Sequence, residues 1–496
     1  MDDSPEPTED QLWSAVADAQ GPERAELLHQ LTGLLYDRGN YQDAATTAEE
    51  SADGFAQADQ PYDEGYTRAQ AGMAYQELGR QAEALSSFTT ACDRFRESGH
   101  EKDCAQATER AGQCLNALDR PQEALSIWDS AQNLFASIGQ PAKAADVALE
   151  RGELLGYLGR QSEALEVFQS ARALRRPLGD AGAVVDIDDR IAAALIDMGR
   201  HGEALKVLRE VLRVRESGTD EQAQAYARYR YGWTLEMAGQ QQDAKPVMEQ
   251  ARAEYQRLDN TYAIARCDLI LADCLHGLGQ SEASIELYQR AASVFDALGA
   301  DDQKLLANVN LAIAYASMGD EEASAQAKTK ALADAESLGN DSLAASIAAQ
   351  LARSLLRLGR TQEARDVMAT HQPPETWRDN VVETAQYQVI HARLLLDERD
   401  FATAADLAQA VINNLDGRQL TNLVAEAYGV MSDAALDTGQ VGLGERYRGK
   451  AIGLYLTAGS PHSAEALATH FLETPTPAST RPTDQQTQNN MEPADV

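Results

Sequence analysis

The sequence has few cysteines, no long apolar run and little basic charge, and each shortage excludes a class of protein. Its five cysteines are odd in number and show no CxxC spacing. This pattern favours a reducing compartment, so we expect a cytoplasmic protein. No stretch approaches the roughly 20 apolar residues that a membrane-spanning helix needs. The N-terminal residues MDDSPEPTED are acidic and contain no apolar segment, so we expect no standard export signal.

Basic residues are scarce relative to acidic ones. Lysine and arginine together number 43 against 78 aspartates and glutamates, which gives a formal net charge of −35. Such a field repels phosphate groups, so the sequence predicts no nucleic-acid partner and no binding to anionic membranes. The charge favours basic or amphipathic segments of other proteins as partners, although solubility alone explains it equally well.

Motifs of catalytic sites are also absent. The sequence contains no phosphate-binding GxxxxGK[ST], no GxSxG, no HExxH and no GxGxxG. Its eight histidines are dispersed, and none has a partner at metal-ligand spacing. We therefore expect that the protein is not an enzyme and holds neither a metal ion nor a cofactor.

What the sequence does contain is one pattern repeated eleven times at a period of 40 residues. A small residue recurs at the start of the second helix expected in each repeat: Ala44, Ala84, Ala124, Ala164, Ala204, Ala244, Ser284, Ser324, Ala364, Ala404 and Gly444. Five residues earlier stands a glycine, which only Asp119 and Arg399 replace. Cys114 and Cys274 share one place in their repeats, where others have leucine or alanine, so we expect them in the core. A period of this length is typical of a solenoid, in which each repeat buries its apolar face against its neighbours.

The second repeat shows why two helices are expected in each. Residues 61–79 begin with a proline, which suits the first position of a helix, and end at Gly79, which can adopt the positive φ that often follows a helix. In residues 81–98, apolar side chains at helical spacing form one stripe: Ala84, Phe88, Ala91 and Phe95. Two such helices cannot bury this stripe alone, so neighbouring repeats must cover it.

This repeat resembles the tetratricopeptide repeat in a longer form. The residues of the second repeat that match the family's pattern are Gly72, Tyr75, Ala84, Phe88 and Ala91. The resemblance covers about 440 of the 496 residues. It implies an all-α fold, a right-handed superhelical α-solenoid of about eleven helix-turn-helix repeats whose first helices line a concave groove. The alanine-rich composition, with more arginine than lysine, favours a bacterial source.

Changes in this pattern divide the chain. At the segment HQPPETW, Pro373 and Pro374 end a helix early, which predicts a boundary between repeats nine and ten; a decorated loop is the alternative. Beyond Leu472 hardly any apolar residue occurs. We expect an acidic lead with a short capping helix in which Trp13 and Val16 share one side, then repeats one to nine, repeats ten and eleven, a second capping helix and a disordered tail, at residues 1–20, 21–380, 381–460, 461–472 and 473–496.

The resemblance also identifies the side chains that face the groove. Those of repeats one to five are mostly acidic: Glu26, Asp37, Glu77, Glu109, Asp146, Glu153, Asp186, Asp189 and Asp197. Repeats six and eight present an aromatic and an aliphatic stripe: Tyr226, Tyr229 and Trp233, and Leu306, Val309 and Ile313. Basic residues lie around and after the aliphatic stripe: Arg266, Arg353, Arg357 and Arg393. Packing inside the solenoid is the alternative role for the two stripes, and a merely solvated face is the alternative for the acidic residues.

We therefore predict a non-catalytic scaffold or adaptor that binds a peptide or helical segment of a partner protein through these stripes and arginines. The alternative is a peptide-responsive bacterial signalling or transcription regulator of tetratricopeptide type. Self-association through complementary acidic and basic parts is a further hypothesis. The groove positions lack the lysine and asparagine with which co-chaperone repeats hold a C-terminal carboxylate, so we do not expect that binding mode.

Overall fold

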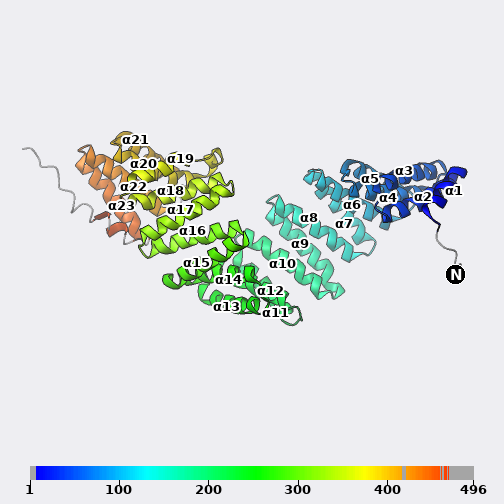
Figure 1. Ribbon diagram of the computed structural model, residues 1–496, viewed down its shortest axis with the longest axis horizontal. Helices are drawn as coiled ribbons and strands as arrows, with labels where there is room; N and C mark the ends of the chain where they lie inside the picture. Colours follow the sequence, from blue (N-terminus) through cyan, green and yellow to red (C-terminus); the bar gives the residue numbers. More distant parts are fainter. Residues whose placement is uncertain (1–6, 416–419, 459, 461–462, 466, 469–496) are drawn as a thin grey trace, which may run out of the picture. The chain divides into compact units, whose positions relative to one another are not determined.

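The computed structural model shows an all-α chain and describes residues 7–415, 420–458, 460, 463–465 and 467–468 (Figure 1). No strand occurs in these residues. The chain forms two compact units, Met1–Cys274 and Leu275–Val496. We call them the N-terminal and the C-terminal unit and describe each by itself.

The helices follow one another as helix-turn-helix repeats, in which even-numbered helices come first and odd-numbered ones second. The helices that begin in the N-terminal unit are α1 (Glu9–Asp18), α2 (Gly21–Asp37), α3 (Tyr41–Gln57), α4 (Pro61–Glu77), α5 (Gln81–Glu97), α6 (Glu101–Ala117), α7 (Pro121–Ser137), α8 (Pro141–Tyr157), α9 (Gln161–Arg175), the 3-10 helix η1 (Arg176–Leu178), α10 (Ala181–Asp197), α11 (His201–Glu216), α12 (Glu221–Met237), α13 (Gln241–Arg257) and α14 (Thr261–Gly277). Those of the C-terminal unit are α15 (Ser281–Leu298), α16 (Asp301–Ser317), α17 (Glu321–Ser337), α18 (Asp341–Arg357), α19 (Thr361–Thr370), the 3-10 helix η2 (Glu375–Asp379), α20 (Val381–Asp397), α21 (Phe401–Asn414), α22 (Thr421–Asp437) and α23 (Val441–Thr457). The predicted fold class, an all-α solenoid of tetratricopeptide-like repeats, is confirmed.

The turn between the two helices of a repeat depends on one residue with positive φ. Gly79 has a φ of 72°, and the next amide, that of Arg80, donates to the Tyr75 carbonyl over 2.8 Å and closes the helix end. Asp119 and Arg399, which interrupt the glycine series, keep this left-handed conformation with φ of 56° and 65°. The repeat therefore imposes a conformation that costs a residue with a side chain about 1 to 2 kcal/mol.

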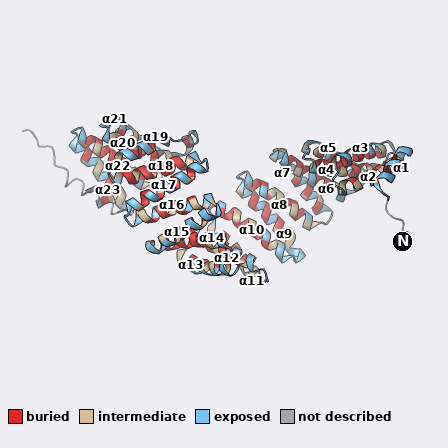
Figure 2. Cartoon of the chain, viewed as in Figure 1, coloured by how far each residue is buried: buried red, intermediate tan, exposed pale blue. Residues whose placement is uncertain are grey.

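In several repeats the core is formed where a large side chain of the second helix meets a glycine of the first. A Cβ atom on Gly72 would lie 2.9 Å from the Phe88 ring, and one on Gly152 would lie 2.4 Å from the Phe168 ring. The small residues at the start of the second helices, such as Ala84, are fully buried. Buried residues thus run through the packed helices, and exposed ones lie at the turns and outer sides (Figure 2).

Helix α1 packs on the first repeat through Val16, as expected, but Leu12 and not Trp13 is buried with it. Trp13 is exposed. The Thr8 hydroxyl accepts from the Gln11 amide, and the Gln11 side chain accepts from the Thr8 amide, which fixes the start of the helix as a capping box.

The cysteines differ from the expectation of an unpaired set. Cys92 in α5 and Cys104 in α6 form a disulfide. They lie on two consecutive helices, so the turn between the helices brings together residues that the sequence spacing alone does not mark as a pair. Cys114, Cys267 and Cys274 are free and buried, which agrees with the core role expected for Cys114 and Cys274.

The division of the structure does not fall at the proline pair. Helix α19 is short, as its prolines predict, but the segment after it packs into the core of the C-terminal unit. The Trp377 indole is buried and donates to the Ser342 hydroxyl over 2.7 Å, and the Tyr387 hydroxyl donates to the Met368 carbonyl over 3.1 Å. The repeats on both sides of the segment therefore share one core.

The expected second capping helix and tail fall largely outside the described residues. Of residues 461–472, only 463–465 and 467–468 are described, and these are helical. The expected tail, 473–496, lies outside the described residues.

Candidate functional site

In the N-terminal unit the aromatic stripe of α12 divides into exposed and buried members. The Tyr226 side chain is 47% exposed, but Tyr229 is only 5% exposed and lies under the Arg266 guanidinium, 4.6 Å from its ring centroid. Burial raises the pKa of Tyr229 to about 12. Trp233 is half-buried and packs against the apolar cluster of α8 to α11. For Tyr229 the structure therefore favours packing over binding, and Tyr226 is the member of the stripe that faces solvent.

The aliphatic stripe of α16 in the C-terminal unit keeps two of its three side chains in solvent. Leu306 is 45% exposed and Ile313 is 47% exposed. Val309, between them, is half-buried and packs against the apolar cluster that α18 shares with α17 and α20. The stripe thus has a fixed base and two exposed apolar ends. We call Leu306, Val309 and Ile313 the α16 stripe.

The three arginines that follow in the C-terminal unit all form ion pairs within the chain. Arg357 lies 2.6 Å from the Glu321 carboxylate, Arg353 3.1 Å from that of Glu426, and Arg393 4.0 Å from that of Asp433 (distances between nitrogen and oxygen). The Nε atom of Arg353 is buried and has no hydrogen-bond partner among the described residues. The arginines lie on α18 and α20, while two of their carboxylates lie on α22, so these helices are linked through charged side chains.

Lys328 on α17 belongs to the same group, and the sequence analysis missed it. Its ammonium donates to the Ser354 hydroxyl over 2.7 Å, and this hydroxyl donates to the Glu321 carboxylate over 2.9 Å. The pKa of Lys328 is lowered to about 8, chiefly by burial; the Glu321 carboxylate opposes this, and the positive charges of Arg357 and Arg353 contribute to it. We call Lys328, Arg353, Arg357 and Arg393 the cationic cluster.

A sequence signal for Lys328 exists. It lies four residues after the small residue Ser324, the place at which the second repeat has Phe88. A lysine where other repeats have an apolar core residue is the mark that could have identified it.

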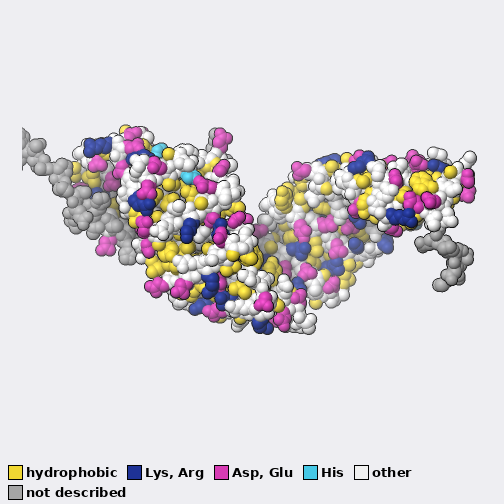
Figure 3. Space-filling model, viewed as in Figure 1, with side chains coloured by type: hydrophobic (Ala, Val, Ile, Leu, Met, Phe, Trp, Pro, Cys, Tyr) yellow, Lys and Arg dark blue, Asp and Glu magenta, His cyan; other side chains and the backbone are white. Residues whose placement is uncertain are grey.

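Many acidic residues of the N-terminal unit are neutralised within the chain. Four of those expected to face the groove pair with arginines: Glu153 with Arg190, Asp186 with Arg215, Asp189 with Arg230, and Asp146 with Arg175. On the face that Figure 3 shows, acidic and basic side chains are interspersed. Part of the acidic charge of this unit is therefore neutralised within the chain.

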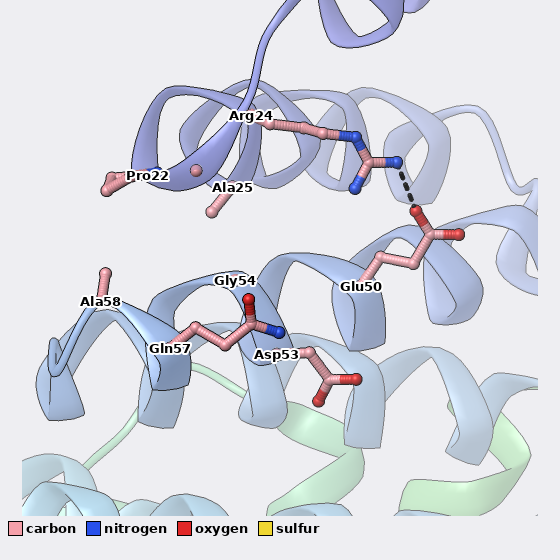
Figure 4. Close-up of a pocket in the computed structure, with 9 residues that line it drawn as sticks. Pro22, Arg24, Ala25, Glu50, Asp53, Gly54, Gln57 and Ala58 are labelled. Carbon is pink, nitrogen blue, oxygen red and sulfur yellow. Dashed lines mark hydrogen bonds and ion pairs between the residues drawn. The ribbon is translucent and has the colours of Figure 1, made fainter.

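The N-terminal unit contains two cavities lined partly by charged side chains. One, of about 560 Å³, lies between α2 and α3, where Arg24 and Glu50 pair across it over 2.8 Å (Figure 4). A second, of about 440 Å³, is lined by Tyr66, Glu109 and Lys143 among others. Burial raises the pKa of Glu109, and the charge of Lys143 opposes this.

The structure offers no site for a metal ion and no membrane span in the part that it describes. There, no three histidine, cysteine, aspartate or glutamate side chains converge as metal ligands would. None of the described helices is both long and apolar enough to cross a bilayer.

Comparison with known proteins identifies the repeat. The family model described as "Tetratricopeptide repeat" matches residues 184–257, and the one described as "Soluble NSF attachment protein, SNAP" matches residues 66–211. No protein of curated function matches the sequence.

Several solved structures are similar to the chain at low identity. A Rap protein complexed with Competence and Sporulation Factor is 11% identical, with 82% of this chain and 99% of that chain covered and a TM-score of 0.39. A signal-transduction ATPase with a tetratricopeptide-repeat sensor from Pyrococcus horikoshii is 14% identical, with 70% and 55% covered and a TM-score of 0.46. BtubC (BKLC) from P. vanneervenii is 17% identical, with 42% and 90% covered and a TM-score of 0.35.

The family match agrees with the 40-residue period and with the helix pairs that the structure shows. The chain is therefore built of tetratricopeptide-like helical repeats, and residues 184–257 match the tetratricopeptide-repeat family model itself.

Proposed function

We propose that the protein is a non-catalytic scaffold whose C-terminal unit binds an amphipathic segment of a partner protein. Apolar side chains of that segment contact the α16 stripe, and its acidic side chains lie toward Arg353, Arg357 and Arg393. The observation that carries the proposal is the exposure of Leu306 and Ile313, two large aliphatic side chains on one helix face.

The physical reason is the arrangement of apolar and charged groups within one unit. Burying two such side chains contributes about 1.5 to 3 kcal/mol each, which suits a segment held by a few anchors. The arginines lie on α18 and α20 of the same unit, and paired arginines orient an acidic segment without attracting it over a long distance. Tyr226 and Arg266 stay predicted contacts of the N-terminal unit in their own right, with Trp233 beside them.

The remaining expectations stay predictions. They are a cytoplasmic location, the absence of nucleic-acid and membrane partners, self-association, and the alternative role as a peptide-responsive regulator. The structure gives no specific reason to prefer the regulator over the scaffold.

The test selects random 12-residue peptides displayed on phage against the full chain. Selected peptides are then measured with a Leu306→Ser, Ile313→Ser double variant. We expect at least a tenfold loss of affinity, about 1.4 kcal/mol or more, because both apolar contacts are removed. The matched control is Leu298→Ser, since Leu298 is equally exposed in the same unit but lies at the end of α15. Equal affinity for the double variant and the wild type would show that the α16 stripe is not the site.

A further inference from the structure

Lys328 occupies a place that most repeats give to the apolar core. The residue four positions after the small residue is buried and apolar in nine other repeats: Ala48, Phe88, Trp128, Phe168, Leu208, Met248, Tyr288, Met368 and Ala408. Besides Lys328, only the last repeat has a charged residue there, Arg448. An ammonium in this environment loses hydration that an apolar side chain does not need. The lysine therefore lowers the stability of the fold, which suggests that it is kept for another role.

The direct hydrogen-bond partner of this ammonium is a neutral group. The ammonium donates one hydrogen bond, to the neutral Ser354 hydroxyl over 2.7 Å, and forms no ion pair with a carboxylate of the described residues. The nearest carboxylate, that of Glu321, is reached through Ser354 and is already paired with Arg357. Lys328 is half-buried, so a part of its surface still faces solvent.

The neighbouring charges leave an excess of positive charge around Lys328. Glu321 compensates Arg357, Glu426 compensates Arg353, and Asp433 lies near Arg393. The Lys328 charge stands in addition to these pairs, in a chain whose net charge is −35. A positive site of this kind is what an anionic group of a ligand would complement.

We propose that the Lys328 ammonium, together with Arg353 and Arg357, binds a carboxylate side chain of the partner segment. This inference rests on the proposed function and specifies its partner: apolar side chains bind the α16 stripe, and an aspartate or glutamate binds at the cationic cluster. A carboxylate here would form a charge-assisted hydrogen bond with the ammonium and would lie close to the guanidinium groups of Arg353 and Arg357. Such bonds are stronger than those between neutral groups and would select acidic partners.

The structure also provides a substitution that separates binding from folding. Methionine fills the same place in two other repeats, as Met248 and Met368, where it is buried. Lys328→Met should therefore fold and lose only the charged group. Lys330→Met is the matched control, because Lys330 is an exposed lysine two residues further along α17.

The experiment selects the phage-displayed 12-residue library in parallel against the wild type, Lys328→Met and Lys330→Met. We expect peptides enriched in aspartate and glutamate from the wild type and from Lys330→Met, but not from Lys328→Met. One wild-type-selected peptide and its Asp→Asn counterpart are then titrated by fluorescence anisotropy. The acidic peptide should bind the wild type about 10- to 100-fold more tightly than the amide form, as charge-assisted bonds predict, and Lys328→Met should lose most of that preference.

The outcomes distinguish this inference from the proposed function. Peptides that depend on Leu306 and Ile313 but show no acidic enrichment would refute the role of Lys328 and leave the proposed function in place. The same refutation follows if Lys328→Met keeps the preference for the acidic peptide. Peptides that ignore the α16 stripe altogether would overturn both.

Discussion

Replacing Lys328 by methionine should stabilise the protein at neutral pH, although it removes a hydrogen bond. Burial lowers the pKa of Lys328 from its ordinary value of 10.5 to about 8, and Arg357 and Arg353 add to the effect while Glu321 opposes it. A lowered pKa means that the folded protein holds the charged amine less favourably than the unfolded chain does. The variant is free of this penalty and places in the core a side chain that other repeats accommodate.

The size of the effect follows from the two pKa values. Each pH unit between them is worth about 1.4 kcal/mol, so the charged amine costs the folded state about 3 kcal/mol. Losing the bond to Ser354 costs the variant about 1 kcal/mol, since the Ser354 hydroxyl keeps its bond to Glu321. At about pH 7 we therefore expect the variant to be more stable by roughly 2 kcal/mol.

The pH dependence has a definite sign. The penalty is fully present below the folded pKa of about 8 and disappears as the pH rises to the ordinary value of 10.5, because the folded protein releases this proton before the unfolded chain does. The stability of the wild type should therefore rise relative to Lys328→Met by about 3 kcal/mol over this range. Tyrosines with raised pKa, such as Tyr75 and Tyr229, titrate in both proteins, so their effect cancels in the difference.

The assay is urea unfolding of the full chain, followed by circular dichroism at several pH values between about 7 and 10. Because repeat arrays can open locally, hydrogen exchange of the α17 and α18 amides should report the same change at the site. Lys330→Met should show no such dependence. A difference between wild type and Lys328→Met that stays constant with pH, or a wild type that is the more stable protein at pH 7, would refute the reasoning.

Three further outcomes are expected. Gly152→Ala should lower the free energy of unfolding by about 1 to 3 kcal/mol, because its Cβ would lie 2.4 Å from a buried ring. The control Gly156→Ala, in the same helix, meets nothing closer than 3.7 Å and should be neutral or stabilising. Equal effects of the two substitutions in urea unfolding would contradict this. Arg399→Gly should raise the unfolding free energy by about 1 kcal/mol, since glycine adopts the φ of 65° without strain, and a loss of stability would be contrary to it. Iodoacetamide should label three cysteines in denaturant without reductant and all five after reduction, and labelling of Cys92 or Cys104 before reduction would disprove their disulfide.

The repeat architecture could be predicted because its determinants are local and recur. A small residue that allows close helix packing and a turn residue with positive φ act within a few positions of the chain, so a fixed period makes them visible. The geometry is strong enough to hold Asp119 and Arg399 in a glycine conformation. The role of Trp377 was not visible in this way, since its indole packs against α18, far back in the sequence.

The candidate site could be predicted only in part. Helical spacing placed Tyr226 and Tyr229 on one face, but three residues along a helix turn a side chain by about 60° from its neighbour, enough to leave one exposed and the other buried under Arg266. Charge is harder still to read, because the partners of Arg353 and Asp186 come from other helices.

The sequence by itself determined the all-α repeat, its period and its turns, because each depends on residues within one helix pair. It also showed that the catalytic motifs named above do not occur. Only the tertiary structure decided which of the expected side chains are exposed, which charges are neutralised, and that Lys328 lies among arginines. These properties depend on what the neighbouring repeats bring to the same place, and no spacing within one repeat encodes that.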